Sequence, residues 1–282
     1  MKPSKSWLYR KTVVLTGASD GIGKELTLRL VRDFDCKVIG IARSTDKLSA
    51  LKASLGDKSS SFSFVSTDVS NADFWSEFSS SLIANEVTVD ILINNAGIMP
   101  PFIPLKKTDE HTFKRTMEVN FYSAYYSSYA LIPLLKKSKF GSIINISSSA
   151  SVCPLPGTSV YSASKSALNA MTIALASEER DLFVSYIRPG FTKTNLFAKN
   201  GDIFDSKIVS AFSTSVQKMA NKILKGIHKK KKRMLFGKDA YFMAGLHKIA
   251  PTSSAPIIKS VMKLSHLPVF TELFTDEPNE KE

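Results

Sequence analysis

Short runs of apolar residues alternate along most of the chain with longer stretches in which apolar residues recur at helical spacing. The short runs are typical of buried strands, and the three-to-four-residue spacing is typical of amphipathic helices. Strands are predicted over residues 12–16, 37–42, 61–67, 89–93, 141–147 and 184–187, and helices over 24–34, 46–55, 72–83, 108–135 and 161–179.

This alternation predicts an α/β fold with a doubly wound, Rossmann-like parallel sheet. The strand runs are apolar over four to six residues, as expected where helices cover both faces of a sheet. After about residue 192 the alternation stops. We therefore expect residues 1–282 to form a single domain that ends in a helical C-terminal extension.

Composition indicates which classes of protein this chain can belong to. Hydrophobic residues make up 43% of the 282 and charged residues 22%, which suits a globular chain with a sizeable core. Two cysteines and four histidines show no disulfide framework and no metal-ligand spacing, so no metal site is expected. The chain shows neither a secretory leader nor an apolar run long enough to span a bilayer, which favours a cytoplasmic protein, with membrane association as a further possibility.

The net charge of +13 is concentrated in one late segment. Between Lys222 and Lys263 there are eleven Lys and Arg residues and one acid, whereas the last sixteen residues carry −4. The basic segment is centred on residues 229–233 and lacks interleaved aromatic residues, so nucleic acid is not an expected partner. A solvated turn, anionic lipid and an acidic substrate remain as explanations for the basic run.

A glycine-rich segment lies between the first predicted strand and the first predicted helix. It runs from Thr16 to Gly23 as TGASDGIG. Glycines permit a tight turn and let the backbone approach a diphosphate, while free N–H groups at the start of a helix favour an anion. An ordinary glycine-rich turn has the same spacing, so it is the position between strand and helix that predicts a nucleotide site.

This turn and five later motifs resemble those of the short-chain dehydrogenase/reductase family. TGxxxGIG is followed in family order by NNAG, a helix asparagine, a serine thirteen residues before YxxxK, and PGxxxT. The resemblance covers about residues 10–196 and implies a dinucleotide-binding and catalytic core there, with Asp68 and Val69 at the adenine edge and a substrate lid and basic extension over 197–282. It also implies a homo-oligomer. The residues expected to bind the cofactor are Gly17, Ser19, Asp20, Gly21, Ile22, Gly23, Arg43, Ser44, Asp68, Val69, Asn95, Ala96, Gly97, Tyr161, Lys165, Pro189, Gly190, Thr192 and Thr194.

The candidate catalytic residues are Tyr161, Lys165, Ser148 and Asn120. Tyr161 and Lys165 are four residues apart and so share one face of a helix, where the ammonium would favour phenolate and lower the tyrosine pKa. Ser148 could donate a second hydrogen bond to a substrate oxygen. By resemblance, Lys165 also binds the nicotinamide ribose and Asn120 holds a water in a proton relay. A YxxxK match can arise by chance, serines flank Ser148, and a helix asparagine can simply cap or pack.

The end of the second predicted strand bears on cofactor choice. An acid there would bind the ribose hydroxyls of NAD, but this chain has Ala42 and then Arg43, whose guanidinium suits a phosphate. Ser19 and Ser44 could add neutral donors. NADP(H) is therefore favoured over NAD(H), although Asp20 stands where many NADP-dependent relatives carry a basic residue. Thr192 is a mild departure, since the family often has Ile or Val there.

Apolar residues after the PG motif suggest a hydrophobic substrate, although they could equally form the core of the lid. The function that these patterns favour is NADP(H)-dependent hydride transfer between nicotinamide and a carbonyl or secondary alcohol. The alternatives are a non-catalytic dinucleotide sensor on the same fold and a membrane-surface interaction protein that uses the C-terminal segment. The lid residues are Phe191, Leu196, Phe197, Ile203, Phe204, Val209 and Phe212.

Overall fold

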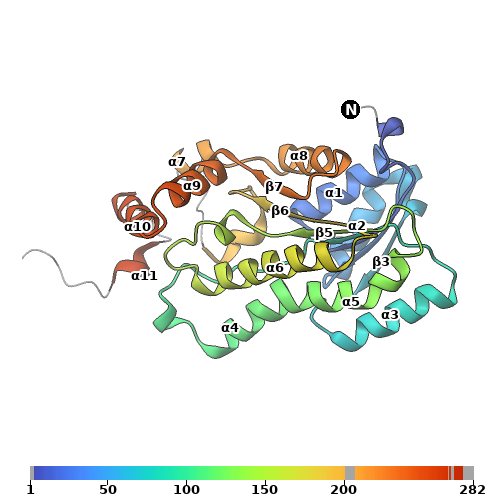
Figure 1. Ribbon diagram of the computed structural model, residues 1–282, viewed down its shortest axis with the longest axis horizontal. Helices are drawn as coiled ribbons and strands as arrows, with labels where there is room; N and C mark the ends of the chain where they lie inside the picture. Colours follow the sequence, from blue (N-terminus) through green and yellow to red (C-terminus); the bar gives the residue numbers. More distant parts are fainter. Residues whose placement is uncertain (1–2, 201–206, 266, 268–269, 276–282) are drawn as a thin grey trace, which may run out of the picture.

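The computed structural model describes residues 3–200, 207–265, 267 and 270–275, and over these residues the chain builds a parallel sheet between two layers of helices (Figure 1). The strand order is β3-β2-β1-β4-β5-β6-β7, and every neighbouring pair is parallel. The chain reverses its winding direction between β1 and β4. The strands are β1 Thr12–Thr16, β2 Lys37–Ala42, β3 Phe62–Ser66, β4 Ile91–Asn94, β5 Ser142–Ile146, β6 Phe183–Pro189 and β7 Arg233–Phe236.

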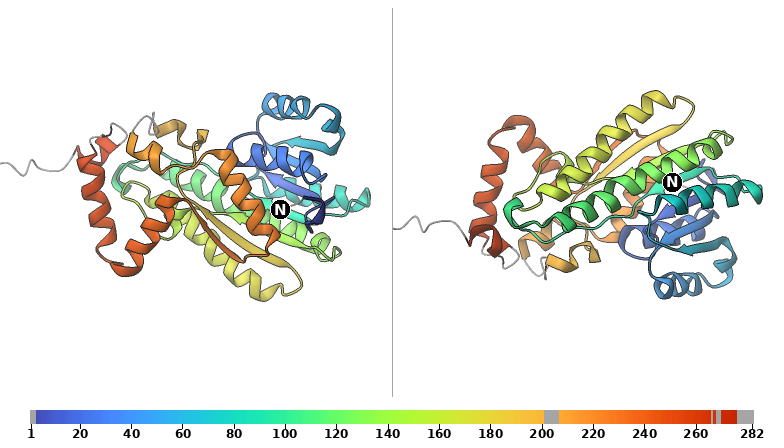
Figure 2. Two further views of the ribbon diagram at one scale, coloured as in Figure 1. Left: turned by 90° about the horizontal axis from the view of Figure 1, so that it is seen from above. Right: turned by 90° about the horizontal axis from the view of Figure 1, so that it is seen from below.

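Helices cover both faces of the sheet, so the predicted doubly wound α/β fold is confirmed. Seen from above and from below, α1, α2 and α8 lie on one face and α3, α5 and α6 on the other (Figure 2). The helices are α1 Gly21–Arg32, α2 Thr45–Ser54, α3 Ala72–Ala84, α4 Glu110–Met117, α5 Ser123–Leu135, α6 Ser159–Glu178, α7 Lys207–Phe212, α8 Val216–His228, α9 Lys238–Ile249, α10 Ser254–Leu264 and α11 Thr271–Phe274.

The expectation that the alternation stops at residue 192 was wrong for α8 and β7. Helix α8 packs an apolar face against α1 and the sheet, and β7 extends the sheet beside β6. Strand β7 has only four residues, follows a run of lysines and buries only Met234 fully. Because so few of its residues are buried, the strand has only a weak apolar pattern in the sequence. The helical C-terminal extension begins after β7 and comprises α9, α10 and α11 (Figure 1).

Strand β7 separates two parts of the basic segment. Residues 229–233 form the turn that enters β7 at the amino ends of the strands, where Lys230 lies over the ring of Trp7. The other end of β7 leads into α9 at the carboxyl ends of the strands. The basic run therefore lies at the amino ends of the strands, whereas α9 begins at their carboxyl ends and leads into α10. In the part of the chain that the structure describes, no helix is long and apolar enough to cross a membrane.

The long helix predicted over 108–135 is interrupted. It is divided into α4, a π-helical turn over Glu118–Tyr122, and α5. Such wider turns within helices occur frequently at functional sites. Asn120 lies in this turn and is buried.

Candidate active site

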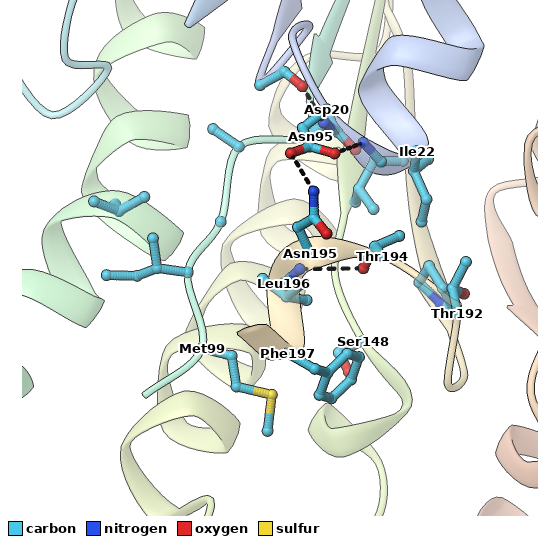
Figure 3. A pocket seen from close by; sticks show the side chains of 18 of the residues that line it. Asp20, Ile22, Asn95, Met99, Ser148, Thr192, Thr194, Asn195, Leu196 and Phe197 are labelled. Atoms are coloured by element: carbon cyan, nitrogen blue, oxygen red, sulfur yellow. Dashed lines mark hydrogen bonds between the residues drawn. The ribbon is translucent and has the colours of Figure 1, made fainter. Parts of the chain in front are cut away.

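A cavity of about 490 Å³ opens at the carboxyl ends of the strands, where the winding reverses between β1 and β4. Its walls come from the glycine-rich turn, the ends of β2 to β6, helix α6 and the segment after β6 (Figure 3). The cavity brings together all the predicted site residues except Gly23 and Asn120. Sequence reasoning missed several lining residues, among them Lys47, Thr67, Met99, Arg115, Leu155 and Asn195.

The glycine-rich turn is fixed to the segment after β4. The Thr16 hydroxyl accepts hydrogen bonds from the backbone N–H groups of Asn95 and Ala96, both at 3.0 Å, and the Asn95 amide donates to the Thr16 carbonyl at 3.0 Å. Gly17 has φ +66°, a conformation that favours glycine. Gly23 serves packing instead, because a Cβ there would lie 2.1 Å from the Gly17 carbonyl oxygen.

The structure distinguishes among the serines after β5. The Ser147 hydroxyl donates to the Lys165 carbonyl at 3.1 Å, and the Ser151 hydroxyl donates to the Ser148 carbonyl. Ser148 is only partly buried, and its side chain lies close enough to Tyr161 to lower the pKa of that phenol. Spacing to Tyr161 had selected Ser148 in the sequence, and the geometry brings these two hydroxyls together.

Tyr161 and Lys165 lie one turn apart on α6 and are both buried. Burial raises the pKa of Tyr161, and the Ser148 side chain partly offsets this. Burial also lowers the pKa of Lys165 to about 8, and its Nζ donates to the Ile146 carbonyl at 3.1 Å. The sequence argument expected Lys165 to lower the tyrosine pKa. Among the protein's own groups burial dominates instead, because it disfavours the charged form of both residues.

The Asn120 side chain makes three hydrogen bonds with protein partners. Its Oδ1 accepts from the Ile98 N–H at 2.8 Å, while its Nδ2 donates to the Ile98 carbonyl at 2.9 Å and to the Ser164 hydroxyl at 3.0 Å. These bonds hold the segment after β4 against α6. A water relay through Asn120 stays a prediction.

A cluster of charged and polar side chains lies at the far end of the cavity, between α1 and α2. Arg43 is exposed and Ser44 caps α2. The Asp20 carboxylate accepts from Lys47 Nζ and from Asn195 Nδ2, both at 2.9 Å, and Figure 3 shows the Asn195 side chain pointing toward Asp20. Burial raises the pKa of Asp20, but its bonds with Asn195, Lys47 and the Gly21 amide outweigh burial and lower the pKa.

Asp68 also has a partner that the sequence did not reveal. Arg115 of α4 forms an ion pair with Asp68 and donates to the Ser70 hydroxyl at 2.8 Å. Both Asp68 and Arg115 line the cavity. The expected adenine edge therefore carries a paired rather than a free carboxylate, and no local sequence signal links two residues 47 positions apart.

The other end of the cavity is apolar. Tyr161 belongs to a cluster of buried hydrophobic side chains that includes Met99, Phe102, Met243 and Ile258. Of the lid residues, Phe191, Leu196, Phe197 and Val209 pack against this cluster, Phe212 is about half exposed, and Ile203 and Phe204 lie outside the described residues. Helices α9 and α10 thus pack in the same hydrophobic cluster as Tyr161, behind the residues that line the cavity.

Comparisons with known proteins agree with this geometry. A family model described as "short chain dehydrogenase" matches residues 11–203. An uncharacterized oxidoreductase of Staphylococcus saprophyticus is 35% identical over 66% of this chain and 76% of its own. An "11-beta-hydroxysteroid dehydrogenase-like 2" of Arabidopsis thaliana is 33% identical over 77% and 70%. The structure of an alcohol dehydrogenase from Thermococcus sibiricus, complexed with 5-hydroxy-NADP, has a TM-score of 0.71 at 25% identity and covers 81% of this chain and 96% of its own.

Proposed function

The chain belongs to the short-chain dehydrogenase family, and from that premise we propose that it is an NADP(H)-dependent oxidoreductase acting on a carbonyl or secondary alcohol of a hydrophobic substrate. The observation that carries the proposal is the position of Ser148, Tyr161 and Lys165 between two contrasting ends of one cavity. A basic cluster lies toward α2 and an apolar cluster lies around Tyr161. Such a cavity suits a charged dinucleotide at one end and an apolar substrate at the other.

The chain's own residues would manage the proton in this reaction. The nicotinamide would supply or accept the hydride. Tyr161 would donate its proton to the substrate oxygen during reduction and recover it during oxidation. Ser148 would hold the same oxygen by a second hydrogen bond, and Lys165 would orient the ribose and favour the phenolate when it carries its proton.

Lys47 supports the proposed preference for NADP(H). Asp20 would repel a phosphate if it stood alone, but its carboxylate is neutralised by the Lys47 ammonium at 2.9 Å. Lys47 and Arg43 both line the cavity, beside the N-terminus of α2 that Ser44 caps. A 2′-phosphate would therefore meet Arg43, a Lys47–Asp20 pair without net charge and a helix N-terminus, a net positive environment that phosphate binding favours.

Variants can test this preference directly. We expect Arg43→Ala and Lys47→Ala each to raise the KM for NADPH about tenfold, with the KM for NADH little changed, because each removes one charged contact with the phosphate. Lys52→Ala, which removes an exposed lysine from the last turn of α2, is the control. Equal losses for both dinucleotides would show that Arg43 and Lys47 act only through the fold.

A panel of carbonyl and alcohol substrates of increasing apolar size tests the reaction itself. Turnover is followed at the NADPH absorbance band, and bulky apolar carbonyls should give the highest kcat/KM. The name of the hydroxysteroid-dehydrogenase-like relative supports including sterols in the panel. Dinucleotide binding without turnover of any compound would favour the alternative, a dinucleotide sensor. The presence of Ser148, Tyr161 and Lys165 together speaks against a sensor, which has no need of proton-transfer groups.

A second candidate function, contact with a membrane surface, is favoured by the outer face of α9. Tyr241, Phe242 and Ile249 are 61%, 66% and 86% exposed, and they share that face with the exposed Lys238 and Lys248. Lysines beside exposed apolar residues are typical of helices that lie on anionic lipid. The inner face of α9 packs in the same hydrophobic cluster as Tyr161, so such contact would bring a lipophilic substrate close to its site.

Liposome sedimentation tests this second function. We expect binding to vesicles that contain phosphatidylserine, loss of binding as salt rises, and loss in the double variant Phe242→Ser/Ile249→Ser. Ile83→Ser, which changes an exposed apolar residue on α3, is the control. Absence of sedimentation at low salt would assign this face to a subunit contact or to solvent.

We also propose that the chain forms a homo-oligomer. Tyr122, Tyr125 and Tyr129 leave a row of exposed rings along the start of α5, where a partner could cover them. Light scattering during size-exclusion chromatography gives the mass. A monomer at micromolar concentration would refute the proposal.

A further inference from the structure

Asp239 is a buried carboxylate that the proposed chemistry does not use. It is the second residue of α9 and only 7% exposed, and it does not line the cavity. Its Oδ2 accepts a hydrogen bond from the Phe191 N–H at 2.6 Å, whereas its Oδ1 has no hydrogen-bond partner among the described residues. An incompletely paired buried carboxylate lowers the stability of the fold, so stability does not explain why an acid stands at this position.

Two glycines make room for this carboxylate. A Cβ on Gly190 would lie 2.2 Å from Asp239 Oδ2, and a Cβ on Gly237 would lie 2.4 Å from Oδ1. Gly190 is the glycine of the PGxxxT motif and lines the cavity. The absence of a side chain at that position therefore admits the carboxylate behind the turn.

The turn that follows β6 is held from two sides. Toward α9, the Gly190 N–H donates to the Phe236 carbonyl at 2.7 Å and the Phe191 N–H donates to Asp239. On the opposite side, the Thr214 N–H donates to the Phe191 carbonyl at 2.8 Å. Asp239 holds the Phe191 N–H by its side chain, so a substitution can remove this bond and leave the backbone bonds in place.

We propose that Asp239 is a positioning residue whose carboxylate holds the turn of residues 189–194 against the end of the cavity that would take the nicotinamide. Pro189, Gly190, Thr192 and Thr194 all line the cavity. The backbone amides of Phe191 and Ala240 and the charge of Lys222 on α8 favour the carboxylate, although burial outweighs them and raises the Asp239 pKa. The nicotinamide part of this inference rests on the proposed function, whereas the fixing of the turn does not.

Two substitutions separate this role from a purely structural one. In Asp239→Ala the Phe191 N–H loses its acceptor, and we expect hydrogen exchange in residues 189–194 to accelerate at least about tenfold. The KM for NADPH should rise by a similar factor in the same variant. Asp239→Asn keeps an oxygen facing the Phe191 N–H, so we expect it to recover most of both effects. Asp73→Ala and Asp73→Asn are matched controls, since Asp73 is the second residue of α3 and is exposed.

Three measurements are made on the full chain. Mass spectrometry follows hydrogen exchange, circular dichroism reports whether the variant folds, and NADPH-dependent turnover gives the KM. Unchanged exchange in the 189–194 turn of Asp239→Ala overturns the inference, and so does faster exchange with an unchanged KM. If Asp239→Ala does not fold, Asp239→Leu, which has a similar shape but no acceptor for the Phe191 N–H, decides instead: faster exchange confined to this turn supports the role, and wild-type exchange overturns it. A wild-type protein that binds no dinucleotide refutes the proposed function instead, and the exchange experiment then still decides whether Asp239 holds the turn.

Discussion

Replacing Lys165 with methionine should stabilise the fold while it removes turnover. Lys165 is 3% exposed, and its Nζ donates a hydrogen bond to the Ile146 carbonyl at 3.1 Å. Burial lowers the pKa of Lys165 from 10.5 to about 8. At neutral pH the folded protein therefore carries a buried ammonium that the unfolded chain would expose to water, and methionine fills a similar space without the charge.

The pKa shift gives the size of this effect. A shift from 10.5 to about 8 corresponds to roughly 3 kcal/mol of unfavourable free energy at pH 7. The substitution also leaves the Ile146 carbonyl without this donor, which costs about 1–3 kcal/mol. We therefore expect the free energy of unfolding to rise by about 0–2 kcal/mol, and Tm to rise by up to about 8 °C, at about 2–4 °C per kcal/mol.

The pH dependence is a sharper test than the single value. Between about pH 8 and 10.5 the unfolded chain holds a proton on Lys165 that the folded chain has lost. Stability of the wild type should therefore rise with pH across this window relative to Lys165→Met, by about 3 kcal/mol in all. Burial of Cys36, which raises its pKa to about 12, acts in the opposite direction above pH 9. That effect is common to both proteins and cancels in their difference.

Urea unfolding of both proteins at pH 7 and near pH 10 supplies the measurement, and Lys137→Met, an exposed lysine at the end of α5, is the control. Lys165→Met should also lose at least about 100-fold in turnover. Two results would refute the reasoning: a stability difference that does not change with pH, or a variant less stable than wild type at pH 7 by more than about 1 kcal/mol.

Four further substitutions have expected outcomes. Tyr161→Phe should lose at least about 100-fold in kcat while the dissociation constant for NADPH stays near wild type, because only the proton donor is removed; retained turnover would reject the assignment. Ser148→Ala should lower kcat by about 10- to 100-fold. Ser147→Ala, in contrast, should lower the free energy of unfolding by about 1 kcal/mol with kcat nearly unchanged, since the Ser147 hydroxyl donates to the Lys165 carbonyl; the reverse ranking in kcat would contradict the assignment of the two serines. Gly23→Ala should destabilise the fold by about 1–3 kcal/mol in urea unfolding, because a Cβ would lie 2.1 Å from the Gly17 carbonyl oxygen; wild-type stability would mean that the turn can move away from α1.

The sequence by itself determined the core of this fold. Strands β1, β4 and β5 are almost wholly buried, and a strand covered on both faces leaves an uninterrupted apolar run that can be read directly. The glycine-rich turn and the YxxxK motif were equally visible, because the chemistry of each depends on residues within one or two helical turns. Every predicted site residue except Gly23 and Asn120 accordingly lines the cavity.

Only the tertiary structure decided the features that depend on distant contacts. Strand β7 was missed because an edge strand of four residues, buried at Met234 alone, has little pattern of its own. Asn120 lies in a π turn and bonds with Ile98, 22 residues away, and Asp239 reaches Phe191 across 48. The raised pKa of Tyr161 also depends on residues distant in the sequence. The spacing to Lys165 predicted a lower value, but burial, which is set by elements across the whole chain, disfavours both charges and outweighs their proximity.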